Sequence, residues 1–133
     1  LVWEKLVDLK SQGTTILLTT HYMEEASYLC DWLIVMDTGR ILATGSPKTL
    51  IGRYIGEEVV EIKVRLAEKG SVVVELKSKG FTFEDWGDSL IMFGDDVSTA
   101  LREGALDGYQ IVRRPGNLED VFLRLTGRGL REE

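Results

Sequence analysis

The sequence contains one cysteine, two prolines and one histidine, and no apolar run approaches the roughly 18–20 residues that span a membrane. The single cysteine, Cys30, excludes an internal disulfide and favours a reducing compartment. Few prolines and a hydrophobic share of 44% argue against a disordered chain. One histidine leaves little material for a histidine metal cluster or a Ser-His-Asp triad. These absences indicate a folded globular chain of 133 residues, sufficient for one domain or two small ones.

The chain also lacks an excess of positive charge. Its 16 basic side chains stand against 22 acidic ones, and the formal net charge is −6. Binding to a phosphate backbone requires the opposite balance, so nucleic acid is not an expected partner. No glycine-rich phosphate loop accompanies the arginines that gather late in the chain. We interpret these arginines as solvated or helix-terminal charges: Arg113, Arg114, Arg124, Arg128 and Arg131.

The first part of the chain, residues 1–56, has the pattern of the end of an α/β domain. The run 14–20 is apolar and β-branched with little alternation, which favours a strand buried on both faces in a parallel sheet. Ser46 and Pro47 are typical of a helix start. The expected helices are 1–11, 22–30 and 47–54, and the expected strands are 14–20, 32–37 and 40–45, the last two joined as a hairpin at Thr38-Gly39. We place a domain boundary near Gly56, and we expect the first helix to begin before Leu1 because no cap precedes it.

The second part, residues 57–133, has a different pattern. The segment 58–66 alternates between apolar and charged residues, which predicts a strand with one solvated face. Further strands are expected at 81–86, 89–93 and 109–113, and helices at 68–79, 96–105 and 117–127, with Asp96 and Asn117 as caps. The order β-α-β-β-α-β-α predicts a ferredoxin-like βαββαβ domain followed by a C-terminal helix.

Few residues in the sequence are candidates for a catalytic or ligand-binding role. No G-x-x-x-x-G-K-[ST] or G-x-G-x-x-G loop occurs, so the chain has no phosphate-cradling loop of its own. Cys30 is interpreted as a buried structural thiol within a helix. His21 stands at the end of the expected strand 14–20, where ligands bind in open α/β sheets. Position alone leaves two roles open for His21, a ligand contact or a hydrogen bond to neighbouring backbone.

The residues around His21 resemble a segment of a known protein family. The segment Thr19-Thr20-His21-Tyr22-Met23-Glu24-Glu25-Ala26 resembles the switch-histidine segment of ABC transporter ATP-binding subunits. Cys30-Asp31, the hairpin 35–41 and Gly45-Ser46-Pro47 continue the match. The resemblance implies that His21 contacts the γ-phosphate of ATP, where an imidazole positions the attacking water and stabilises charge. Tyr22 departs from the family, because many relatives carry Asp there as a helix cap, an interaction commonly worth about 1 kcal/mol.

The end of the chain narrows the resemblance. Residues 117–128, NLEDVFLRLTGR, resemble the closing motif of drug- and polysaccharide-export subunits, the daunorubicin-resistance-like group, which carry an accessory C-terminal domain. The resemblance implies that residues 1–56 are the last part of a P-loop nucleotide-binding domain and that residues 57–133 are the accessory domain. It further implies ATP and Mg²⁺ as cofactors, a second copy of the subunit and a transmembrane permease as partners, and a place at the cytoplasmic side of the cell membrane.

The family motifs that bind and cleave ATP are missing from the 133 residues. Walker A, the signature motif and Walker B are absent, and we expect them before Leu1. We therefore expect the chain to be inactive alone, although its full-length parent would hydrolyse ATP to drive export. We also expect self-association, either through the exposed edge of strand 14–20 or by exchange of elements between chains. The alternative is a regulatory or small-ligand-binding ferredoxin-like module without a catalytic role.

Overall fold

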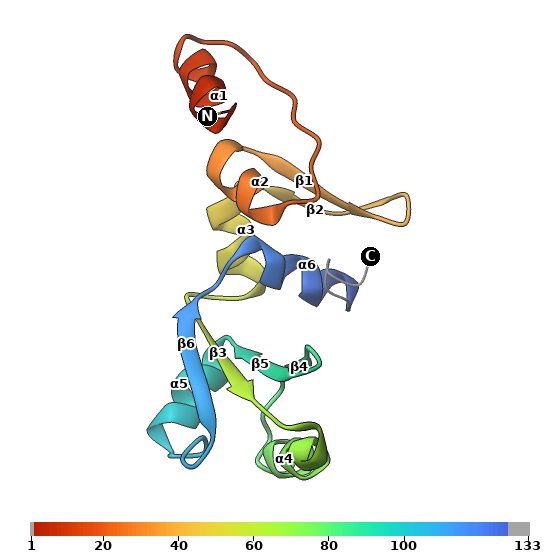
Figure 1. The fold of residues 1–133 in the computed structure, drawn as a ribbon, viewed down its shortest axis with the longest axis vertical. Helices are drawn as coiled ribbons and strands as arrows, with labels where there is room; N and C mark the ends of the chain where they lie inside the picture. Colours follow the sequence, from red (N-terminus) through yellow and green to blue (C-terminus); the bar gives the residue numbers. More distant parts are fainter. Residues whose placement is uncertain (1, 128–133) are drawn as a thin grey trace.

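The computed structural model describes residues 2–127. Within these residues the chain forms six helices and two antiparallel sheets, arranged along one long axis (Figure 1). The elements are α1 (Val2–Ser11), α2 (Met23–Leu29), β1 (Leu33–Asp37), β2 (Arg40–Gly45), α3 (Pro47–Tyr54), β3 (Glu58–Lys63), α4 (Leu66–Ser78), β4 (Glu84–Asp85), β5 (Ser89–Phe93), α5 (Asp95–Arg102), β6 (Gln110–Pro115) and α6 (Leu118–Thr126). Arg128 and Arg131 lie outside the described residues. None of the helices described is long and apolar enough to cross a membrane.

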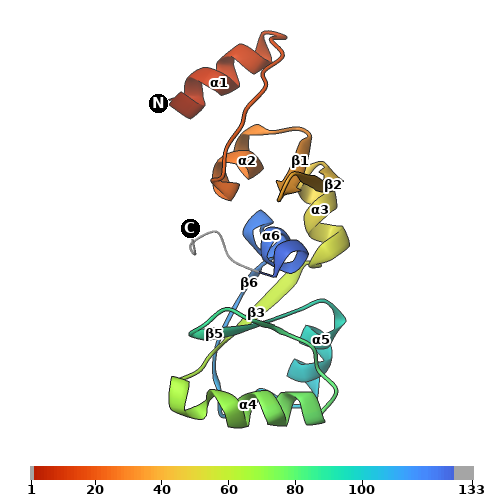
Figure 2. The same cartoon turned by 90° about the vertical axis from the view of Figure 1, so that its right-hand side faces the viewer.

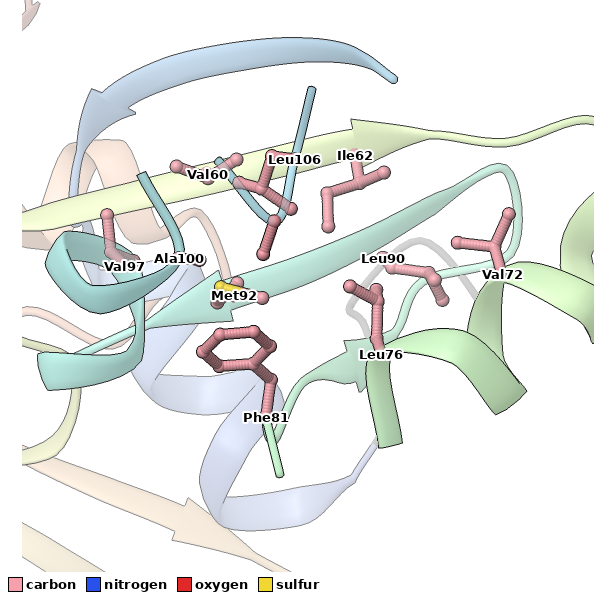
Figure 3. Packing of buried hydrophobic residues seen from close by; sticks show 11 residues of the cluster. Val60, Ile62, Val72, Leu76, Phe81, Leu90, Met92, Val97, Ala100 and Leu106 are labelled. Atoms are coloured by element: carbon pink, nitrogen blue, oxygen red, sulfur yellow. The ribbon is translucent and has the colours of Figure 1, made fainter. Parts of the chain in front are cut away.

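The second half has the predicted ferredoxin-like architecture. Its sheet has the strand order β4-β5-β3-β6, and every pairing is antiparallel. Helices α4 and α5 lie on one face, and Figure 3 shows the apolar side chains that fill the space between these helices and the sheet. This first core contains Val60, Ile62, Val72, Leu76, Phe81, Leu90, Met92, Val97, Ala100, Ala105 and Leu106.

The sheet is covered on its second face as well, which corrects the prediction of a half-solvated strand. Val60 and Ile62 of β3 face the first core, as predicted, but Val59 on the opposite face is also fully buried. Val59 belongs to a second core to which α6 contributes. The alternation in 58–63 gave no sign of this, because the covering helix comes from a segment more than fifty residues later in the sequence.

Helix α6 packs between the two halves of the molecule (Figure 2). The second core joins residues from α2, the hairpin, α3, the sheet and α6: Ala26, Val35, Ala43, Leu50, Ile55, Val59, Ile91, Leu118, Val121 and Phe122. Gly116 makes the approach to α6 possible, since a Cβ there would lie 2.9 Å from Ile55 Cγ2 and 3.0 Å from Gly56 O. The two halves therefore share one core around α6.

The prediction of a parallel strand at 14–20 is wrong. These residues are extended but form no strand, and Leu17 is 95% exposed. A strand needs a hydrogen-bonded neighbour, and none of the strands described lies beside this segment. The strand expected at 32–37 does form as β1, but Ile34 and Met36 are more than half exposed, so it is not buried on both faces.

Three smaller expectations also need correction. The strand expected at 81–86 is reduced to Glu84–Asp85. Asp96 does not cap α5, whose N-cap is Gly94. The Asp96 carboxylate instead accepts hydrogen bonds from the Thr82 backbone N–H and hydroxyl, both at 2.9 Å. Cys30 is the C-cap residue of α2 rather than a mid-helix residue, and it is only partly buried against the second core.

Candidate functional site

His21 lies on the surface at the junction between the extended segment 14–20 and α2. Its side chain is exposed, and its ring packs on the ring of Tyr22 with the centroids 4.3 Å apart and the planes at 33°. Within residues 2–127 the imidazole makes no hydrogen bond or ion pair. Of the two roles that position left open, the hydrogen bond to neighbouring backbone is therefore not observed, and both ring nitrogens can reach a ligand.

The backbone around His21 is held by local hydrogen bonds. The Tyr22 N–H donates to Thr20 Oγ1 at 3.0 Å, and the Tyr22 carbonyl accepts the Ala26 N–H at 3.1 Å, which begins α2. Tyr22 is the N-cap residue and its side chain makes no capping bond, in agreement with the departure from the family pattern. The position of His21 is therefore set by the first turn of α2.

A carboxylate at the start of α2 connects this region to α1. Trp3 Nε1 donates to Glu25 Oε2 at 2.8 Å, and the Trp3 ring stacks on Tyr28 at a centroid distance of 5.1 Å. The hydrogen bond from Trp3, followed by one from Thr20, lowers the pKa of Glu25. Glu25 thus stays ionised in the first turn of α2, and its charge is already engaged with neighbouring donors.

A buried ion network joins α6 to the sheet, and its central residue corrects a prediction from the sequence. Arg114 is not a solvated charge: its side chain is 18% exposed, and its two terminal nitrogens donate to both oxygens of Asp120 at 2.7 and 2.8 Å. Arg114 Nε also donates to Glu61. The side chain of Asp120 is only 1% exposed. The available signal was the Asn117-x-x-Asp120 pattern, which predicts a capping box with a fixed acidic residue.

The ferredoxin-like half contains a polar groove of about 590 Å³ between α4 and the start of β6. Its polar lining carries charges of both signs, from Lys63, Arg65, Glu68 and Glu75. Tyr109 on the opposite wall donates its hydroxyl to Glu75. Burial, followed by this carboxylate, raises the pKa of Tyr109 to about 12. A neutral phenol and charged side chains of both signs therefore line the groove at neutral pH.

The comparisons with known proteins agree with the resemblance found in the sequence. Residues 71–127 match the family model described as the C-terminal domain of the nodulation factor export protein NodI. The chain is 43% identical over 135 residues to the Nod factor export ATP-binding protein I of Mesorhizobium japonicum, with 99% of this chain and 38% of the relative covered. The corresponding protein of Rhizobium etli is 46% identical, and the match covers 96% of this chain and 40% of the relative. That of Ralstonia nicotianae is 41% identical, and the match covers 99% of this chain and 43% of the relative.

These matches run through both halves of the chain, including the segment around His21 and helix α6. The chain spans about two fifths of the length of these relatives. Over nearly all of its length the chain is therefore similar to part of the Nod factor export ATP-binding proteins, and its residues 71–127 match the C-terminal domain of that family.

Proposed function

We propose that this chain is the C-terminal part of an ABC exporter ATPase and that His21 contacts the γ-phosphate of bound ATP. The observation that carries the proposal is the exposed imidazole of His21, which has no hydrogen-bond or ion-pair partner within residues 2–127 and stands in a segment shared with proteins named as ATP-binding. An imidazole with both nitrogens accessible donates to a phosphoryl oxygen or orients the attacking water.

The residues present fit a terminal phosphate but not a whole nucleotide. His21 supplies one donor, while the sequence has no glycine-rich loop to hold the α- and β-phosphates. ATP with Mg²⁺ supplies the phosphoryl group whose transfer drives the transport cycle. We therefore propose that nucleotide binding needs the remaining length of such a subunit and that the isolated chain does not hydrolyse ATP.

The proposal extends to the assembly. We place the nucleotide-binding part at residues 1–56 and the accessory domain at residues 57–133, with the accessory domain stabilising or regulating a dimer of subunits. The subunits would dock on a transmembrane permease at the inner face of the membrane. The export function in the names of the relatives supports this arrangement.

A chimera tests the role of His21. The segment of the Mesorhizobium japonicum relative that matches this chain would be replaced by residues 1–133, and ATP hydrolysis would be measured. We expect His21→Ala to lower kcat by roughly 100-fold, the usual contribution of a positioned proton-transfer group. The matched control is Gln12→Ala, an exposed polar substitution at the other end of the extended segment. Unchanged hydrolysis in His21→Ala, or clear ATPase activity of the isolated chain, would contradict the proposal.

The groove beside α4 supports a second candidate, a small-ligand-binding regulatory module. Its lining of both signs suits a small zwitterion. Thermal unfolding would be recorded with free amino acids and, separately, with ATP. Stabilisation by an amino acid that is lost in Arg65→Ala favours this candidate. An unfolding temperature that no amino acid raises argues against it.

A further inference from the structure

We propose that Arg114 is a positioning residue: through its pair with Asp120 it fixes helix α6 on the sheet, and α6 in turn sets the position of α2 and of His21. The importance of His21 rests on the proposed function, whereas the mechanical connection rests on contacts within the described residues alone. The connection has three steps.

The first step joins the sheet to α6. Arg114 projects from β6, and its planar guanidinium matches the carboxylate of Asp120 with two parallel hydrogen bonds of 2.7 and 2.8 Å. The same guanidinium bonds Glu61 on β3, whose second oxygen accepts from Lys63 Nζ at 3.2 Å. One side chain thus connects two strands to the first turn of α6.

The orientation of α6 depends on this pair. Asp120 Oδ2 also accepts the Asn117 N–H at 2.9 Å, and Asn117 Oδ1 accepts the Asp120 N–H at 2.9 Å. The carboxylate that caps the helix is therefore the one held by Arg114. Because the side chain of Asp120 is only 1% exposed, water does not readily replace Arg114 as its partner.

The second step joins α6 to α2. Val121 and Phe122 of α6 belong to the second core together with Ala26 of α2 and Leu50 of α3. Figures 1 and 2 both show α6 directly between the sheet and the α2–hairpin layer. A shift of α6 would therefore be transmitted to α2 through close-packed side chains.

The third step joins α2 to His21. The Ala26 N–H donates to the Tyr22 carbonyl in the first turn of α2, and the ring of Tyr22 packs against the His21 ring. Ala26 itself is 7% exposed and belongs to the core against α6. His21 is thus only five residues from a side chain that α6 fixes.

The two cores make this connection distinguishable from general stability. The first core, beneath α4 and α5, shares no residue with the second core around α6. If Arg114 acts as a positioning residue, its loss should loosen α2 and α3 and leave α4 and α5, which contribute only to the first core, protected. A merely structural role would lower the protection of all these elements together.

The experiment uses the whole chain of 133 residues with Arg114→Gln, and Arg113→Gln as the matched control. Arg113 is the adjacent arginine on the same strand, but its side chain is 57% exposed in a surface pair with Glu58. Residue-resolved amide exchange and the NMR resonances of the His21 imidazole would be recorded. We expect Arg114→Gln to speed exchange in α2 at least tenfold, to leave α4 within threefold of wild type, and to shift the His21 resonances. Arg113→Gln should change neither.

Uniform acceleration in α2, α4 and α5, or an unchanged α2 and His21 environment, would overturn the inference. If Arg114→Gln fails to fold, Arg114→Lys keeps the charge, loses the two-pronged contact and must give the same selective pattern. These readouts involve no nucleotide. An active chimera with His21→Ala would therefore disprove the proposed role of His21 and leave the connection through α6 standing.

Discussion

At the scale of single residues, His21 and Asp120 have opposite environments. The His21 side chain is exposed and has no hydrogen-bond partner among the described residues. The Asp120 carboxylate is buried and accepts three hydrogen bonds, two from Arg114 and one from Asn117. Removing one partner of a buried ion pair leaves an uncompensated charge in the interior, so substitutions at these two positions should affect different properties. His21 variants should retain their stability, whereas Asp120 variants should lose it.

Replacing Asp120 with Ala should destabilise the fold by about 3 kcal/mol, because it leaves Arg114 without its bidentate partner and removes one half of a capping box. The measurement is the free energy of unfolding in urea. Glu119→Ala is the control, since it removes the same charge from the same helix turn where no such pair exists. Equal losses in the two variants would show that Asp120 acts only as a helix-end charge.

Glu61 should give the fold a defined sensitivity to acid. Burial raises the pKa of Glu61, but hydrogen bonds from Arg114 and Lys63 outweigh it and hold the pKa below its usual value. The folded pKa is thus lower than the unfolded value of about 4.3. The unfolded chain therefore binds the proton more readily, and this stability is present above that value and lost as the pH falls through the folded pKa.

Glu61→Gln should therefore be less stable than wild type at neutral pH, and the difference should shrink as the pH falls below the unfolded pKa of Glu. Urea unfolding at several pH values checks this, with the exposed Glu57→Gln as control. A gap between Glu61→Gln and wild type that stays constant with pH would contradict the assignment.

At the scale of elements, the sequence predicted features that depend on neighbouring residues, such as helix caps and turns. It did not predict features that depend on contacts between distant segments. Ser46-Pro47 and Asn117 correctly predicted the starts of α3 and α6, because a cap acts through bonds within one helix turn. The turn at Thr38-Gly39 was likewise predicted, and both residues have positive φ. The prediction of a strand at 14–20 was wrong. The segment has β-forming residues, but no strand among the described residues lies beside it to pair with.

The same distinction applies to the candidate site. His21 was found because a contiguous segment resembled a known motif. The Arg114–Asp120 pair was missed, because the contact between these two side chains forms only when β6 and α6 are placed side by side in the fold. The second face of β3 was missed for a related reason: α6 covers Val59 from far along the chain. Sequence periodicity reports which face is apolar, but not which element will cover it.

The cap of α3 gives a prediction at this scale. Ser46 Oγ accepts the Thr49 N–H at 3.1 Å, and Pro47 occupies the first position of the helix. Ser46→Ala should cost about 1 kcal/mol of unfolding free energy, the usual value for a lost N-cap. Ser98→Ala is the control, because its hydroxyl donates to Asp95 O inside a helix and caps nothing. A loss in Ser98→Ala as large as in Ser46→Ala would contradict this role for Ser46.

At the scale of the whole molecule, the two ends differ in how completely their apolar residues are buried. The ferredoxin-like half encloses its core beneath two helices, whereas the first half exposes a group of large apolar side chains: Val2, Val7, Ile16, Leu17, Trp32, Ile34, Met36 and Ile41. Large exposed apolar side chains favour association when they gather on one surface. The predicted edge of strand 14–20 does not exist as a strand, so the outer face of the β1–β2 hairpin is the better candidate for self-association.

Met36 and Ile41 are paired across the hairpin and are 58% and 61% exposed. We expect the weight-average mass in sedimentation equilibrium to rise with concentration from 14.9 kDa toward that of a dimer. The double variant Met36→Glu/Ile41→Lys should remain monomeric, because the opposite charges preserve the cross-strand pair while removing the apolar surface. Val74→Lys, equally exposed on α4, should associate like wild type. A wild-type chain that stays monomeric at submillimolar concentration would exclude the hairpin as an association surface, and the exposed apolar side chains would then be tolerated by a stable monomer.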